Sequence, residues 1–161
     1  MNTRRLWKVG AGLALAWLLA SGAATMAQER DLGLDQYMGK HPDKQFMALP
    51  VVHDSLTRLL GDKLNSFMSR FQVTDRIDQI GRDLVAAGCV KHKCAAEQVA
   101  FAIDLDTGHV AAASLRQGRY MDVYSRDTTN YDDLPPGLRH WISSRTSDTT
   151  SFKKMEFRYF K

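Results

Sequence analysis

The N-terminal half of the chain places its large apolar residues at helical spacing. Pro50 limits where a first helix begins, and Gly61 with Asp62 marks a break before a second one. We therefore predict one short helix near 52–60 and another near 62–70, each with an apolar face packed against a sheet. The two faces consist of Leu56, Leu59 and Leu60, and of Leu64, Phe67, Met68 and Phe71.

Further along the chain, large and small side chains alternate, which is typical of strands. A short apolar run at 84–89 predicts one strand, and residues 97–115 predict a hairpin in which large side chains alternate with alanines. The turn of this hairpin is Asp-Leu-Asp-Thr-Gly-His at 104–109, where Gly108 can take a positive φ. Residues 118–126 predict the next strand, with tyrosines and an aspartate alternating against a methionine and a valine.

Two elements remain at the C-terminal end. Acidic residues and two prolines precede the apolar part of 131–145, a pattern typical of a helix start, and residues 151–161 predict a last strand. Together the elements predict an α+β fold, in which the N-terminal helices cover one face of a central antiparallel sheet of about five strands. The polar residues 28–43 predict a mobile lead-in. No repeat or linker divides 28–161, so we expect a single domain there.

Residues 1–27 have the pattern of a cleaved secretory signal peptide. Arg4, Arg5 and Lys8 precede an apolar run at 9–24, and Ala27 occupies the position before the expected cleavage site. The run is shorter than the roughly 20 apolar residues that a membrane-spanning helix needs. We therefore predict a periplasmic or secreted protein that has no contact with the membrane after the signal is removed.

Removal of the signal changes the net charge. Three of the 22 Lys and Arg residues and none of the 18 acidic residues lie in 1–27, so residues 28–161 carry a net charge of 19 − 18 = +1, against +4 for the whole chain. A nearly neutral protein has no general attraction for phosphate backbones. We therefore predict no nucleic-acid partner.

The only two cysteines, Cys89 and Cys94, enclose a basic tip of Lys91, His92 and Lys93. In an oxidising compartment two such cysteines are expected to pair, and a loop of about six residues gains only about 2 kcal/mol from the bond. The bond would then mainly shape the loop. Three alternatives stay open: a zinc site, although no second cluster supplies a fourth ligand; a nucleophilic cysteine; and a structural disulfide with an idle histidine.

The sequence lacks the motifs of the common hydrolases and nucleotide-binding enzymes, so we predict neither an enzyme nor a bound cofactor or metal. A restrained loop, in contrast, loses little entropy when it binds a partner. The natural complement of a basic tip is a narrow acidic cleft, and glycoside hydrolases hold two carboxylates in such a cleft. An imidazole between them can hydrogen-bond to both and exclude the substrate.

The stretch from Gly88 to Ser114 resembles the inhibitor of vertebrate lysozyme (Ivy) family of periplasmic proteins. The loop of that family reads Cys-Lys-Pro-His-Asp-Cys and leads directly into a strand and a hairpin. Cys89, His92 and Cys94 match its two cysteines and its histidine at the same spacing. At the other three positions the family residues Lys, Pro and Asp are replaced by Val90, Lys91 and Lys93.

The resemblance implies a periplasmic inhibitor of c-type lysozyme with an antiparallel sheet and helices on one side. The disulfide-closed loop would enter the active site, where His92 would meet the catalytic carboxylates and Lys91 and Lys93 would flank it. A second hypothesis assigns the same basic tip to a non-inhibitory envelope module that binds peptidoglycan, an anionic glycan or another envelope protein. A homodimer is a further candidate assembly.

Overall fold

The structure is a computed structural model, which describes residues 32–146 and 156–160; the expected signal peptide lies outside them. The helices are α1 (Lys44–Met47), α2 (Pro50–Leu60), α3 (Leu64–Met68) and α4 (Pro136–Arg145), with 3-10 turns at Asp35–Tyr37, Gly61–Lys63 and Tyr131–Asp133. The strands are β1 (Val73–Thr74), β2 (Asp78–Ile80), β3 (Asp83–Cys89), β4 (Gln98–Asp104), β5 (Val110–Arg116), β6 (Tyr120–Tyr124) and β7 (Glu156–Phe160).

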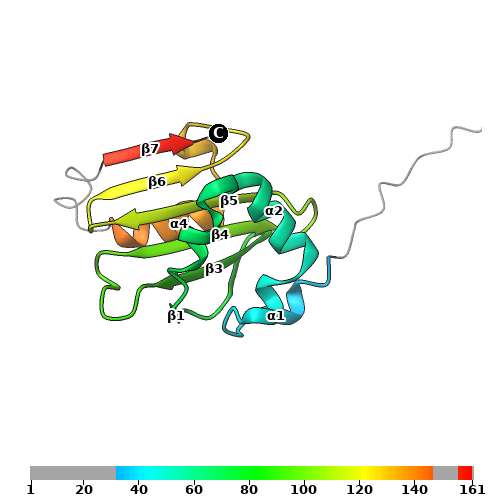
Figure 1. Cartoon of the computed structure of the whole chain (residues 1–161). Coiled ribbons are helices and arrows are strands. Elements are labelled where there is room, and N and C mark those ends of the chain that lie inside the picture. Colours follow the sequence, from blue (N-terminus) through cyan, green and yellow to red (C-terminus); the bar gives the residue numbers. More distant parts are fainter. Residues whose placement is uncertain (1–31, 147–155, 161) are drawn as a thin grey trace, which may run out of the picture.

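The described strands form one sheet with the order β1-β3-β4-β5-β6-β7 (Figure 1), and β2 pairs with β3 beyond the end of β1. The predicted α+β fold is confirmed, although the sheet has seven strands where the sequence predicts about five. Every pair is antiparallel except β6 and β7, which run parallel. The parallel pair arises because α4 lies in the connection between the two strands, and parallel neighbours need such a crossover.

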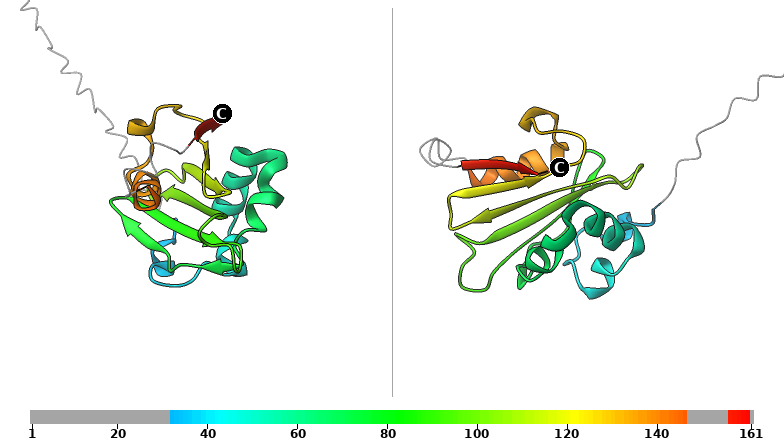
Figure 2. Two further views of the ribbon diagram at one scale, coloured as in Figure 1. Left: turned by 90° about the vertical axis from the view of Figure 1, so that its left-hand side faces the viewer. Right: turned by 45° about the horizontal axis from the view of Figure 1, so that its top comes forward.

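The sheet is covered on both faces, as the edge-on view in Figure 2 shows. The N-terminal helices pack on one face, where Val99, Phe101 and Ile103 of β4 point towards them. The alternate residues Ala100 and Ala102 face α4 on the other side. The alternation predicted for β4 is therefore confirmed, and the small alanines leave room for α4, a second covering layer that the sequence did not predict.

The two N-terminal helices differ slightly from their predicted positions. α2 begins at Pro50, two residues earlier than expected, because proline is well suited to the first turn of a helix. The second helix consists of the 3-10 turn Gly61–Lys63 followed by α3. Residues 32–43 are not the mobile lead-in that was predicted, since Leu34 is fully buried in the core.

The predicted hairpin turn is confirmed between β4 and β5, where Gly108 has a φ of 71°. No helix within 32–146 and 156–160 is long and apolar enough to cross a membrane.

The turn at Gly108 lies at one end of the sheet. The loop that joins β3 to β4 and the turn that joins β5 to β6 lie together at the opposite end, where Gly118 N–H donates to the carbonyl of Ala96 at 3.0 Å.

Candidate functional site

The loop between β3 and β4 begins at Cys89, the last residue of β3, which lies opposite Gln98 at the start of β4. Cys89 and Cys94 form a disulfide with a Cα–Cα distance of 5.0 Å, so the predicted pairing is confirmed. Because both sulfurs are in this bond, neither is a thiolate that can attack a substrate or bind a metal. Within the described residues, no group of three or more His, Cys, Asp or Glu side chains is arranged to hold a metal ion.

His92 occupies the bend of a tight turn. Lys93 N–H donates to the carbonyl of Val90 at 2.8 Å, and His92 has a φ of 64°. A positive φ at the third position is the mark of a type II turn, in which glycine or asparagine is usual. A side chain in this left-handed region costs roughly 1–2 kcal/mol. The loop therefore holds the imidazole at its tip in spite of a conformational cost, and such strain tends to occur at functional positions.

Backbone hydrogen bonds close the loop below this turn. Val90 N–H donates to the carbonyl of Glu97 at 3.0 Å, and Glu97 N–H donates to the carbonyl of Lys93 at 2.8 Å. The side chains of Lys91, His92 and Lys93 are exposed, and none of them has a hydrogen bond or an ion pair to another described residue. The structure thus brings the three predicted site residues together as free groups on a closed loop.

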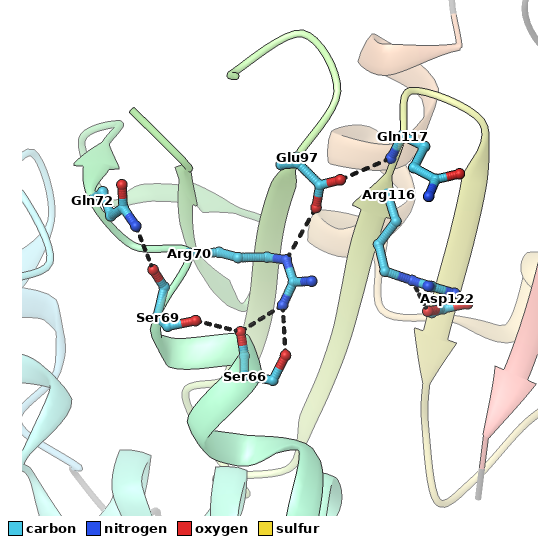
Figure 3. Close-up of polar contacts among 8 residues, drawn as sticks. All are labelled: Ser66, Ser69, Arg70, Gln72, Glu97, Arg116, Gln117 and Asp122. Atoms are coloured by element: carbon cyan, nitrogen blue, oxygen red, sulfur yellow. Dashed lines mark hydrogen bonds and ion pairs between the residues drawn. The ribbon is translucent and has the colours of Figure 1, made fainter. Parts of the chain in front are cut away.

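Glu97 ties the base of this loop to its neighbours (Figure 3). Its Oε2 lies 3.4 Å from Nε of Arg70, and its Oε1 accepts a hydrogen bond from the backbone of Gln117 at 3.1 Å. The side chains of Arg70 and Glu97 are about four-fifths buried, so solvent screens this pair less than a surface pair. Because Arg70 neutralises Glu97, the loop keeps the positive charge of its two lysines.

Gln72 contacts the loop from the segment between α3 and β1. Its backbone N–H donates to the carbonyl of Cys89 at 3.2 Å, and its Oε1 accepts the backbone N–H of Lys91 at 3.1 Å. Its own Nε2 donates to the carbonyl of Ser69 at 3.0 Å, so both ends of the amide are fixed. The sequence shows no sign of a role for Arg70, Gln72 and Glu97, because nothing in the local pattern shows that residues about 20 to 27 positions apart will meet.

Replacing Gln72 by alanine is expected to weaken binding of the loop to its target about fivefold. The substitution removes the acceptor for Lys91 N–H, and one hydrogen bond of this kind contributes about 1 kcal/mol. Gln79→Ala is the matched control, because Gln79 is also exposed but lies in β2 away from the loop. Affinity measured by titration calorimetry should fall for Gln72→Ala only; equal affinities for both variants would show that the loop does not need this contact.

Comparison with known proteins identifies a family for the chain. A family model described as "Inhibitor of vertebrate lysozyme (Ivy)" matches residues 51–147, which is more than half of the chain. The matched segment runs from α2 through α4 and contains the whole disulfide loop. No curated protein and no solved structure gives a significant match.

Proposed function

The chain belongs to the Ivy family, the inhibitors of vertebrate lysozyme, and from this premise we propose that it inhibits lysozyme by inserting the loop Cys89–Cys94 into the active-site cleft. Family membership supports the inhibitory role in general. The loop is assigned as the inhibitory element because it presents His92 on a closed and supported turn. This exposed histidine in a left-handed backbone conformation is the single observation that carries the proposal.

The proposed mechanism is occlusion of the catalytic carboxylates. Glycoside hydrolases hold two carboxyl groups on either side of the bond that they cleave. The histidine ring has a nitrogen on each side, so one N–H can donate to the ionised carboxylate while the other nitrogen accepts a hydrogen bond from the protonated acid of the pair. The disulfide and the hydrogen bonds below the tip restrain the loop before it binds, which lowers the entropy cost of association. The c-type lysozymes are the target class that we propose.

The lysines have a different role from the histidine. Lys91 and Lys93 lie on either side of His92 and are exposed, and neither has an acidic partner among the described residues. Charges at the rim of an interface chiefly guide encounter and set the partner, and they add less to the final affinity. Lys91 and Lys93 should therefore accelerate association with an acidic cleft, whereas His92 should determine how long the complex lasts.

Lys91 stands where the loop of the family has proline. Proline is favoured at the second position of a type II turn, because its fixed φ restrains the turn. Proline has no N–H, whereas Lys91 N–H donates to Gln72. The contact with Gln72 therefore restrains this turn by a hydrogen bond instead of by a ring, which supports the proposal that the loop is preorganised.

Replacing Cys89 by serine is expected to weaken inhibition more than it weakens folding. A loop of this length gains only about 2 kcal/mol from the bond, while binding depends directly on the shape of the loop. Chemical unfolding and inhibition should be measured on Cys89→Ser and on Cys94→Ser, which should behave alike. Variants that unfold at the growth temperature would show instead that the bond mainly stabilises the fold.

A titration against c-type, g-type and phage lysozymes tests the proposed function. Inhibition of the c-type enzyme at one-to-one stoichiometry is expected, with weaker or no effect on the other two. The rival hypothesis of a non-inhibitory envelope module predicts sedimentation with peptidoglycan and no effect on any lysozyme. That pattern would refute the inhibitor proposal for this chain.

The place of action that we propose is the periplasm or the exterior. The N-terminal pattern of residues 1–27 and the disulfide both support export, because such bonds persist in oxidising compartments. Mass analysis of exported protein without reductant should show a chain that begins near Gln28 and is about 2 Da lighter than the dithiol form. Retention of residues 1–27 would contradict the proposed signal peptide.

A further inference from the structure

A polar cavity separate from the tip of the loop lies between α3 and the strands β5, β6 and β7. Its volume is about 290 Å³. Small-molecule sites usually measure about 300–1,000 Å³, so this cavity is near the lower limit and suits a ligand of roughly monosaccharide size. It lies on the sheet face that carries the N-terminal helices, where Phe67 of α3 packs in the same cluster as Tyr124 and Phe160.

Two hydroxyl groups without a hydrogen-bond partner line this cavity. The residues Ser114 and Tyr124 are only 3% and 7% exposed, and neither hydroxyl has a hydrogen-bond partner among the described residues. Both hydroxyl oxygens keep some exposure to the cavity, because the fully buried unpaired side-chain atoms of the described residues are Nε of Arg139 and Nε1 of Trp141. Burial, and then the nearby Asp122 carboxylate, raise the pKa of Tyr124, so its hydroxyl remains protonated at neutral pH and can donate. A polar ligand in the cavity would satisfy both groups.

The charged side chains of the lining are two paired arginines, one aspartate and one lysine. Arg116 donates to both oxygens of the buried Asp122, at 2.6 and 3.2 Å, and the two face each other in Figure 3. Arg70 pairs with Glu97. Lys63 has no acidic partner among the described residues; its Nζ lies over the ring of Phe160, 3.9 Å from the centroid. Because the two arginines are each paired with a carboxylate, Lys63 is the lining cation of the described residues that remains available to an anionic ligand.

Aromatic rings supply an apolar side. Tyr124 and Phe160 stack with their centroids 5.1 Å apart, and Phe67 meets Tyr124 edge-on at 6.5 Å. The carboxylate of Asp122 keeps unused lone pairs after it accepts from Arg116, since each of its oxygens can accept more than one hydrogen bond. The cavity thus combines a cation, two hydroxyl donors, an acceptor and ring faces.

We propose that this cavity binds a small carboxylated saccharide. Lys63 would hold the carboxylate, and Ser114, Tyr124 and Asp122 would form hydrogen bonds to the sugar hydroxyls. The site shares no residue with the tip of the loop, although Arg70, which lines the cavity, also pairs with Glu97 at the base of the loop. A sugar acid bound here would attach the protein to an acidic glycan while the loop stays free.

Titration with N-acetylmuramic acid, followed by amide NMR of isotope-labelled protein, tests the site. N-acetylglucosamine is the neutral probe and lactate is the probe without a sugar ring. The acidic sugar is expected to bind with shifts at Lys63, Ser114 and Asp122, and both other probes should bind at least fivefold more weakly. Equal binding of the neutral sugar, or of lactate, would overturn the assignment to a carboxylated saccharide.

Isosteric variants separate binding from folding. Ser114→Ala and Tyr124→Phe remove hydroxyls that bond to no described residue, so both should fold with unchanged thermal stability and lose about fivefold in affinity for the acidic sugar. Lys63→Gln should lose about tenfold, whereas Lys44→Gln, at an exposed lysine of α1, should bind normally. Unchanged affinity in all three cavity variants would overturn the site. Lysozyme inhibition should be the same in every variant, so the two proposals fail separately.

Discussion

Replacing His92 by alanine is expected to weaken inhibition of c-type lysozyme about thirtyfold. In the proposed complex the imidazole of His92 lies at the centre of the interface with lysozyme, where it is desolvated and hydrogen-bonded to the catalytic carboxyl groups. Truncation of such a central residue typically costs 2 kcal/mol or more. Inhibition constants for His92→Ala should be compared with those for Lys91→Ala and Lys93→Ala at low and moderate salt. The lysine variants should lose less, and their loss should shrink as salt screens the charges.

Because His92 has a left-handed backbone conformation, a second variant can separate the loss of the ring from a change in stability. His92→Gly removes the same ring, and glycine adopts a φ of 64° without strain, so its stability should equal or exceed that of the parent. Alanine keeps the backbone strain. Both variants should lose inhibition to a similar degree although their stabilities differ. A folded His92→Ala protein that inhibits as well as the parent would contradict the proposed mechanism. A larger loss of binding in Lys91→Ala and Lys93→Ala than in His92→Ala would favour the glycan-binding alternative.

Replacing Phe101 by alanine is expected to lower the free energy of unfolding by about 3–5 kcal/mol. Phe101 is fully buried in β4, and its ring lies 6.2 Å from that of Phe46 and 6.0 Å from that of Phe71. Truncation leaves a cavity between the sheet and the N-terminal helices. Because Phe71 immediately precedes Gln72, the loss of packing should also weaken the support of the loop.

Urea unfolding followed by circular dichroism measures the effect on Phe101→Ala. Val73→Ala is the matched control, because Val73 is apolar but 44% exposed on the two-residue strand β1. It should change the free energy of unfolding by no more than about 0.5 kcal/mol. Equal effects of the two substitutions would mean that the core does not centre on the contact between β4 and the N-terminal helices.

Much of the fold was predictable because long elements carry a periodic signal. The alternation in β4 and β6 separated the residues that lie on the two faces of the sheet, and Gly108 marked the hairpin turn. β1 and β2 were not predicted, because strands of two and three residues are too short to show a periodic pattern. The parallel pairing of β7 was missed, although the sequence held a signal for it: a helix predicted between two strands is typical of a parallel crossover.

The candidate site was predictable only in part. Cysteine spacing and the resemblance identified Cys89, Cys94 and the tip between them, and the structure confirms the disulfide. The roles of the tip residues remain a prediction. The supporting residues Arg70, Gln72 and Glu97 were not predictable, because each contact joins segments that only the sheet register brings together. The polar cavity under α3 was missed for the same reason, since Ser114 and Tyr124 look like ordinary strand residues in the sequence.

Competition for the lysozyme cleft tests the central proposal most directly. Calorimetric titration of c-type lysozyme with this protein should be performed with and without a chitooligosaccharide that fills the active site. The insertion of the loop predicts a one-to-one complex without the sugar, and an apparent Kd that rises linearly with the concentration of free sugar. A complex that is indifferent to the sugar, or the absence of any complex, would contradict the insertion of the loop into the cleft.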